Sequence, residues 1–189
     1  MHPRRTRAHS VTAWWHRLLH VSVDCRVVRG DTLRPSAFFS GDNLATLDCV
    51  IANPPFSLEK WGEGVWASDP YGRNFAGMPP SKSGDYAWVQ HMIKSMAPAT
   101  GRMAVVLPHG ALFRMGREGE IPKKILQMDL LAAGIALGPK HLYGTGRAGR
   151  ILVFPTGRTT DRTERVRLLR ASAESTPGSA PQARPPAPA

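Results

Sequence analysis

The stretch DCVIANPPFS, residues 48–57, joins an apolar run to a rigid polar corner. The apolar residues predict a buried strand over residues 47–53. Two prolines and an aromatic ring follow Asn53 immediately. Asn-Pro and Pro-Pro are common turn dipeptides, so one interpretation is a rigid surface turn. The other is a ligand-binding corner, because open α/β sheets bind ligands beyond the carboxyl ends of their strands.

Strands and helices alternate around this stretch. The apolar pattern predicts helices at 84–98 and 119–132, and further strands at 26–31, 101–110, 132–138 and 149–155. Apolar strands separated by helices indicate a parallel sheet covered on both faces, which is a doubly wound α/β fold. The connection from 57 to 83 is too long and too polar for a routine link, so we expect a functional or a mobile loop.

The two ends of the chain differ from its middle. Residues 1–15 open with a basic cluster and show no clean period, so we expect them to be disordered. Residues 172–189 are rich in proline and alanine and contain no large apolar residue, which predicts a disordered tail. One domain is therefore expected over residues 16–171.

Composition excludes several classes of protein. Hydrophobic residues make up 42% of the chain, which is normal for a soluble globular protein. No apolar run approaches the roughly 20 residues of a membrane-spanning helix, and no signal peptide follows the basic N-terminus. Cys25 and Cys49 form no metal-type spacing, and no metal site is expected. Cys49 in its apolar run is expected to be a buried thiol in a reducing, cytoplasmic setting.

The net charge of +11 lies mainly at the ends: residues 1–34 contribute +5 and residues 158–189 contribute +3. Such a charge can attract nucleic-acid phosphates. It is equally consistent with arginine-rich termini that bind nothing specific.

The corner has a chemistry that suits methyl transfer to an exocyclic amine. The lone pair of such an amine is delocalised into its ring, and positive charge grows on nitrogen as the methyl group arrives. The side-chain oxygen of Asn53 and the carbonyl of Pro54 can accept hydrogen bonds from the two N–H groups, as a cation-side counterpart of an oxyanion hole. Proline fixes φ and removes competing N–H donors. Phe56 offers a flat face to a base flipped out of its duplex.

Seven stretches make this sequence similar to a known family. In chain order they are GDTLRP (30–35), DCVIANPPFS (48–57), WASDPYGR (66–73), PPSKSGDYAWVQHM (79–92), GRMAVVLPHGALFR (101–114), GEIPKKILQMDLLAAGIALGPKHLYGTG (119–146) and ILVF (151–154). By their order and spacing, residues 16–173 resemble the modification (methyltransferase) subunits of type I restriction-modification systems, which are N6-adenine DNA methyltransferases. The resemblance implies a Rossmann-like, S-adenosylmethionine-dependent methyltransferase fold.

The resemblance also implies roles for individual residues. The family's adenine-binding catalytic motif corresponds here to Asn53, Pro54, Pro55 and Phe56. Asp31 takes the position that family members use near the adenine of the cofactor, S-adenosylmethionine. Tyr143 and Gly144 take the opposite wall of the target-base pocket, where they and Phe56 would contact the substrate. The family's partners are double-stranded DNA, a specificity subunit and often a restriction subunit.

The sequence departs from the family pattern in three places. An aromatic-x-Gly-x-Gly cofactor loop should precede Asp31 by several tens of residues, and nothing there matches. The amino-terminal helical region is missing, and a proline-rich tail replaces the helices expected after residue 174. We therefore expect a partial catalytic domain from a truncated or decayed gene, without the first two strands of its sheet. The segment GTGRAG (144–149) matches a cofactor-loop pattern literally, but a strand pattern follows it where a helix is required.

Two other functions stay open. One is a protein glutamine-N5 methyltransferase, although that family favours tyrosine at the position of Phe56 and lacks the DPYGR and LPHG segments found here. The other is a non-catalytic remnant that binds partner subunits or DNA. For single residues, Asp31 also suits a turn-forming aspartate, and His109 suits a structural histidine in a Pro-His-Gly turn.

Overall fold

The computed structural model describes residues 28, 30–34, 38–40, 43–113, 116–138, 148–157 and 163–171. The ends that were expected to be disordered, residues 1–15 and 172–189, lie outside this part of the chain, as do Tyr143 and Gly144. Of the strand expected at 26–31, only Val28, Gly30 and Asp31 are described, and none of them is in a strand.

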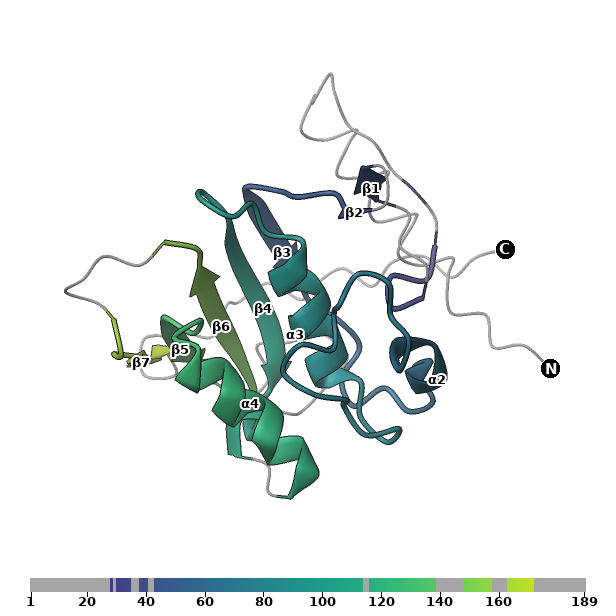
Figure 1. The fold of residues 1–189 in the computed structure, drawn as a ribbon. Coiled ribbons are helices and arrows are strands. Elements are labelled where there is room, and N and C mark those ends of the chain that lie inside the picture. Colours follow the sequence, from purple (N-terminus) through teal and green to yellow (C-terminus); the bar gives the residue numbers. More distant parts are fainter. Residues whose placement is uncertain are drawn as a thin grey trace, which may run out of the picture.

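A five-stranded sheet forms the centre of the molecule (Figure 1). Its strands are β3 (Cys49–Ala52), β4 (Arg102–Pro108), β5 (Ala133–Ala136), β6 (Gly149–Pro155) and β7 (Arg167–Arg170). They lie in the order β3-β4-β6-β5-β7. β3 is parallel to β4 and β5 is parallel to β7, but β6 is antiparallel to both of its neighbours. The expectation of an all-parallel sheet is therefore wrong for β6, because an apolar run carries no information on strand direction.

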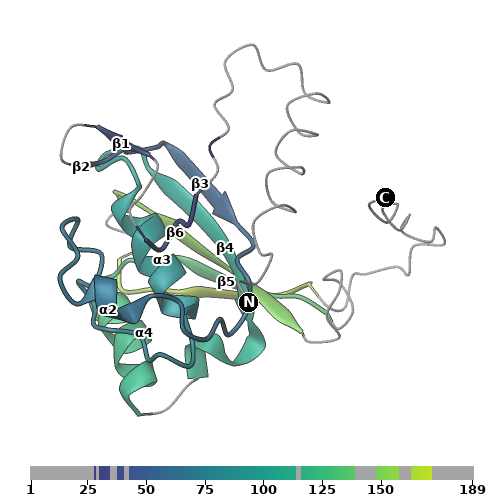
Figure 2. The ribbon, with the colours of Figure 1, turned by 90° about the vertical axis from the view of Figure 1, so that its right-hand side faces the viewer.

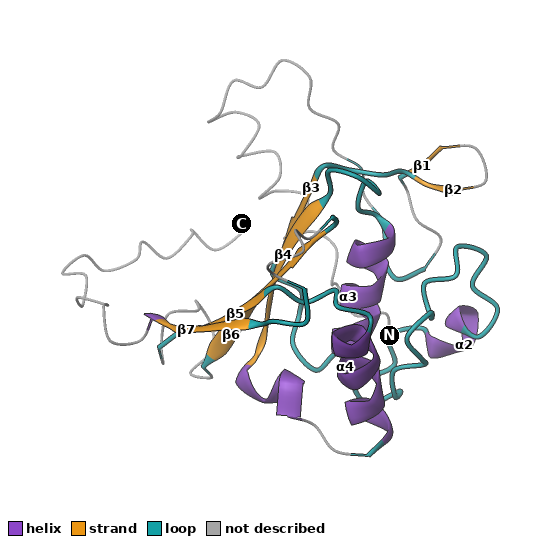
Figure 3. Cartoon of the chain, turned by 60° about the vertical axis from the view of Figure 1, so that its left-hand side comes forward, coloured by secondary structure: helices purple, strands orange, loops and turns teal. Residues whose placement is uncertain are grey.

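The helices in the described ranges are α2 (Glu63–Trp66), α3 (Asp85–Lys94), α4 (Arg117–Gln127) and a 3-10 helix over His109–Phe113. α3 and α4 confirm the two predicted helices. Both lie on the same face of the sheet (Figure 3). Cover on both faces was expected, but in the described part of the chain these helices cover one face only.

β3 lies at the edge of the described sheet, so its side chains are less buried than its apolar sequence suggests. Ile51 is 77% exposed and Cys49 is also exposed. The expectation of a buried strand and a buried Cys49 thiol is therefore wrong. β3 has only one described neighbouring strand, and the described helices cover only one of its faces. Its alternate side chains therefore stay uncovered.

The main core lies between the sheet and the helices that cover it. Alternate residues of β4 point into it, as the period of a strand requires. Its buried members are Ala76, Tyr86, Val89, Met92, Met96, Met103, Val105, Leu107, Ala111, Ile121, Ile125, Leu131, Leu152 and Phe154. A second, smaller cluster contains Leu33, Trp61, Trp66 and Ala87. The two clusters use opposite sides of α3, which fixes that helix between the sheet and the segment that carries α2.

A small antiparallel hairpin was not predicted from the sequence. It consists of β1 (Phe39–Ser40) and β2 (Asn43–Leu44), and Figure 2 shows it beside the start of β3. Within the described ranges, no helix is long and apolar enough to cross a membrane.

Candidate functional site

The Asn-Pro-Pro-Phe corner follows the last residue of β3 directly. Asn53 and Pro55 are exposed, Pro54 is buried and Phe56 is half-buried. The corner is therefore anchored through Pro54 and open to solvent at Asn53. It is not packed shut beneath other side chains, as a purely structural turn could be.

The two residues that follow the corner, Ser57 and Leu58, are hydrogen-bonded to the start of α3. Ser57 has a φ of 50°, and its N–H donates to Oδ1 of Asp85 over 2.7 Å. One residue further, the carbonyl of Leu58 accepts a hydrogen bond from the N–H of Gly84, 2.9 Å away. Asp85 is buried and opens α3, where the helix dipole favours a carboxylate. These bonds fix the direction in which the chain passes Phe56.

The long connection over residues 57–83 packs as a fixed part of the fold. The buried side chain of Gln90 on α3 accepts a hydrogen bond from the N–H of Ala76 over 2.8 Å and donates one to the carbonyl of Gly77 over 3.0 Å. These contacts argue against the expectation of a mobile loop, and the expectation of a functional loop stays a prediction.

A basic and aromatic cluster lies at the same end of the sheet as Asn53. Because β6 runs antiparallel to β4, the start of β6 lies opposite Pro108 at the carboxyl end of β4. Nε of Arg150 donates to Nδ1 of His109 over 3.3 Å, and the guanidinium lies 5.0 Å from the ring centre of Phe113. Phe113 is 64% exposed. Sequence reasoning missed Arg150 and Phe113, because their proximity depends on an antiparallel pairing that the apolar pattern does not encode.

Asp31 is exposed and makes local contacts. Its Oδ1 accepts the N–H of Leu33 over 3.2 Å, and its Oδ2 lies 3.4 Å from Nε of Arg34. The N–H of Arg34 also donates to the carbonyl of Asp31 over 3.1 Å. The turn-forming interpretation of Asp31 is therefore confirmed. It does not exclude the cofactor role, since the same residue lies at the edge of a cavity.

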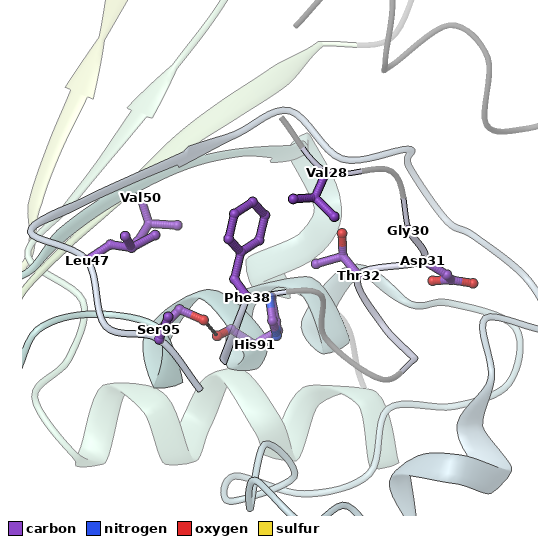
Figure 4. Close-up of a pocket in the computed structure, with 10 residues that line it drawn as sticks. Val28, Gly30, Asp31, Thr32, Phe38, Leu47, Val50, His91 and Ser95 are labelled. Carbon is purple, nitrogen blue, oxygen red and sulfur yellow. Dashed lines mark hydrogen bonds between the residues drawn. The ribbon is translucent and has the colours of Figure 1, made fainter. Parts of the chain in front are cut away.

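This cavity has a volume of about 120 Å³ and lies between Val28, residues 30–32 and Phe38 on one side and β3 and α3 on the other. Its lining residues are Val28, Gly30, Asp31, Thr32, Phe38, Ala45, Leu47, Val50, His91 and Ser95. Figure 4 shows Phe38 and Val28 between Val50 on one side and Asp31 on the other, with the carboxylate of Asp31 turned away from His91. The walls are thus mostly apolar, with polar groups at the edges.

His91 is the one buried histidine on this wall in the described part of the chain. Its pKa is lowered from 6.5 to about 4, first by burial and then by the positive charge of Arg73, while Asp69 raises it in part. The imidazole is therefore neutral at neutral pH. Nη1 of Arg73 lies 3.4 Å from Nδ1 of His91. Because a guanidinium can only donate, Nδ1 accepts and the ring proton is on Nε2.

The described residues fit one part of a nucleoside cofactor. Whole small-molecule sites measure about 300–1,000 Å³, and this cavity of about 120 Å³ is smaller. Its apolar walls suit a flat ring, and Asp31 lies at the rim with its carboxylate turned outward. Across the described ranges no strand is followed by a glycine-rich loop that opens a helix. No group of three or more His, Cys, Asp or Glu residues in those ranges could hold a metal ion.

Residues 17–182 match the sequence model of the N-6 DNA methylase family, and this match covers most of the 189 residues. The chain belongs to the N-6 DNA methylase family. The family assignment made from the sequence is confirmed. The roles of the individual residues in the corner and the cavity stay predictions.

Relatives of this N-6 DNA methylase chain include methylase subunits of type I restriction enzymes. The type I restriction enzyme MjaVII methylase subunit of Methanocaldococcus jannaschii is 32% identical over 159 residues, which cover 81% of this chain and 26% of the relative. The HindI methylase subunit of Haemophilus influenzae is 37% identical over 98 residues, which cover 51% of this chain and 21% of the relative.

Among solved structures, the type I restriction-modification system methyltransferase subunit from Streptococcus thermophilus superposes with a TM-score of 0.68 and 28% identity. The superposition covers 79% of this chain and 31% of that subunit. The methyltransferase fold class is thereby confirmed. The chain spans about a quarter of the length of the curated relatives, 26% in the first of them.

Proposed function

We propose that this chain carries the catalytic corner of a site-specific adenine-N6 DNA methyltransferase, the modification subunit of a type I restriction-modification system. The observation that carries the proposal is the open corner from Asn53 to Phe56 at the carboxyl end of β3. Membership of the N-6 DNA methylase family supports it. The acceptor is an adenine flipped out of double-stranded DNA, and the methyl donor is S-adenosylmethionine.

In this proposal the corner activates the amino group by accepting its hydrogen bonds. Oδ1 of Asn53 and the carbonyl oxygen of Pro54 each accept from one N–H of the adenine, which concentrates the lone pair on nitrogen and stabilises the positive charge that develops there. The half-buried ring of Phe56 stacks on the base. S-adenosylmethionine, when bound, supplies an electrophilic methyl group on a sulfonium. Asp31 would contact the adenine end of that cofactor, and Tyr143 and Gly144 would form the far wall of the base pocket.

The partners follow from the same proposal. The cluster of Arg150, His109 and Phe113 offers a cation and an exposed ring at the catalytic end of the sheet, which suits a phosphate and an unpaired base. A specificity subunit would read the DNA sequence, and a restriction subunit would complete the complex.

Substitution of Asn53 tests the proposal. We expect Asn53→Ala to reduce methyl transfer from labelled S-adenosylmethionine to duplex DNA by about 10²-fold or more, because one of two acceptors for the developing charge is lost. The assay contains the chain together with its specificity subunit, and a parallel arm offers protein glutamine as acceptor. Asn43→Ala, at an exposed asparagine of β2, is the matched control and should retain activity. Undiminished DNA methylation by Asn53→Ala would reject the role of Asn53, and transfer to protein alone would indicate the glutamine methyltransferase.

A second candidate is a non-catalytic remnant that binds partner subunits or DNA. The observation in its favour is the cavity of about 120 Å³, which is smaller than a whole small-molecule site of about 300 Å³ or more. Calorimetric titration of the chain with S-adenosylmethionine separates the two. Binding in the micromolar range supports the enzyme, and no binding supports the remnant.

A further inference from the structure

The segment from Asp31 to Arg34 is held by side chains that lie more than thirty residues further along the chain. Its three successive carbonyl groups each accept a side-chain hydrogen bond. The carbonyl of Thr32 accepts from Nη1 of Arg73 over 3.1 Å, and that of Arg34 accepts from Nη2 of Arg73 over 3.4 Å. Between them, the carbonyl of Leu33 accepts from the indole N–H of Trp66 over 2.6 Å. We call Arg73 and Trp66 the carbonyl clamp.

Arg73 is itself held rigidly. Its side chain is 1% exposed, and its Nη2 and Nε donate to Oδ1 of the buried Asp69 over 2.6 and 2.9 Å. Oδ2 of Asp69 accepts the backbone N–H of Arg73 over 2.7 Å, which closes a local ring. The guanidinium also lies 4.7 Å from the ring centre of Trp66 and 5.4 Å from that of Tyr71. These contacts fix the orientation of the Arg73 guanidinium independently of its hydrogen bonds to the carbonyls of residues 32–34.

A contribution to stability does not by itself explain the buried ion pair of Arg73 and Asp69. Desolvation of two charges costs about as much as their attraction returns, so apolar residues of the same volume often serve a core equally well. A planar guanidinium with several donors in fixed directions is, however, well suited to hold several carbonyl oxygens in one geometry. The clamp therefore specifies a conformation of the 31–34 segment.

The held segment includes the turn that presents Asp31. The N–H groups of Leu33 and Arg34 donate to the side chain and the carbonyl of Asp31, respectively. Leu33 is 1% exposed and packs in the cluster with Trp61 and Trp66. Asp31 itself is exposed and belongs to no helix or strand, so nothing in regular secondary structure fixes it. Its position depends on the turn, and the turn depends on the clamp.

We infer that Arg73 is a positioning residue, which with Trp66 fixes the Asp31 turn at the edge of the cavity in the geometry that the nucleoside end of the cofactor requires. The ligand named here rests on the proposed function. The clamp itself rests only on the contacts described above. A pre-organised turn loses less conformational entropy when a ligand binds, so loss of the clamp weakens binding even though Arg73 does not touch the ligand.

Amide exchange and cofactor binding, measured on the full chain, test the inference together. Arg73→Lys keeps the charge but not the fork, and Trp66→Phe keeps the ring but removes the indole donor. In both variants we expect exchange at the amides of Leu33 and Arg34 to become about tenfold faster, which corresponds to about 1.4 kcal/mol, while amides of α3 keep their protection. The matched control is Arg102→Lys, at an exposed arginine of β4. It should change neither the amide exchange of Leu33 and Arg34 nor the binding of S-adenosylmethionine.

Binding of S-adenosylmethionine shows whether the clamp acts through Asp31. We expect Arg73→Lys and Asp31→Asn each to weaken binding by about tenfold, and the double variant to bind no more weakly than either single variant, because coupled residues are not additive. Additive losses would overturn the positioning role, and so would unchanged exchange at Leu33 and Arg34 in both clamp variants. If the unsubstituted chain binds no S-adenosylmethionine, the cofactor part of the proposed function fails and the ligand named here fails with it, whereas the exchange rates still confirm or overturn the clamp.

Discussion

His91 shows how one buried residue makes the stability of the molecule depend on pH. Its pKa falls from 6.5 in the unfolded chain to about 4 in the folded protein, mainly because of burial and then because of Arg73. Above pH 6.5 the ring is neutral in both states. Between pH 6.5 and 4 the unfolded chain binds a proton that the folded protein excludes. The free energy of unfolding must therefore decrease as the pH falls through this window.

We expect protonation of this histidine in the unfolded chain to lower the free energy of unfolding by about 3 kcal/mol as the pH falls through this window, since each pKa unit corresponds to about 1.4 kcal/mol. Urea denaturation over the window measures the effect. In His91→Gln the amide oxygen can still accept from Arg73, but the side chain does not titrate, so the variant should lose less stability on acidification than the unsubstituted chain. His109→Gln, at an exposed histidine, is the control and should follow the unsubstituted chain. Parallel pH curves for His91→Gln and the unsubstituted chain would contradict the assignment.

Sequence reasoning reached some single residues and not others. A site role for Asn53 was predicted from its neighbours in the chain, because a corner after a strand is a local feature that a short stretch contains, and that role stays a prediction. The roles of Arg73 and Trp66 were not identified, because their partners at residues 32–34 lie up to 41 positions away. No local pattern marks a side chain whose hydrogen bonds go to a distant backbone.

At the scale of elements, the segments with a strong period were predicted well. α3 confirms the predicted helix, because its apolar residues recur at steps of three or four. β4 confirms the predicted strand, because a continuous apolar run follows a glycine turn. The burial of β3 was predicted wrongly, since an apolar run does not show whether its strand is central or at an edge. β1 and β2 were missed because each has only two residues, which is too few to show a pattern. β7 was missed because its two leucines lie between two arginines and all four residues are exposed, so no apolar run marks the strand.

The turn between α3 and β4 depends on the absence of a side chain at Gly101. Its N–H donates to the carbonyl of Ala97 over 2.9 Å, and its own carbonyl accepts from Thr156 over 2.8 Å. A Cβ added at Gly101 would lie 2.5 Å from the carbonyl oxygen of Ala97 and 2.7 Å from its nitrogen. Both are backbone atoms, which cannot move without displacing the turn.

We therefore expect Gly101→Ala to lower the free energy of unfolding by about 1–3 kcal/mol, the usual cost of forcing extra atoms into a packed site. Thermal and urea denaturation measure it. Gly64→Ala in α2 is the matched control, because nothing lies within 4 Å of the added Cβ and alanine favours a helix by about 1 kcal/mol over glycine. Equal stability of the two variants would show that the Gly101 turn can relax.

At the scale of the whole molecule, the described sheet buries one face much more than the other. Met103, Val105 and Leu107 of β4 and Leu152 and Phe154 of β6 are buried in the core that includes residues of α3 and α4, whereas Ala104, Val106, Ile151 and Val153 on the opposite face are half-buried. A doubly wound sheet normally has helices on both faces. In the described ranges the core therefore lies between the sheet and one layer of helices. The contribution of an apolar side chain to the free energy of unfolding depends on which face of the sheet it occupies.

The same substitution at two isoleucines, one on each side of the sheet, compares the stability that the two faces contribute. Ile121 of α4 is 1% exposed in the main core, and Ile51 of β3 is 77% exposed on the other side of the sheet. Ile121→Ala should cost about 2–5 kcal/mol, because a cavity replaces buried methyl groups. Ile51→Ala should change stability by no more than about 0.5 kcal/mol, as expected for an exposed position. The free energy of unfolding from urea titration measures both. A cost at Ile51 that approaches the cost at Ile121 would mean that another part of the chain, or a second molecule, covers this face in solution, and the one-sided core would then be wrong.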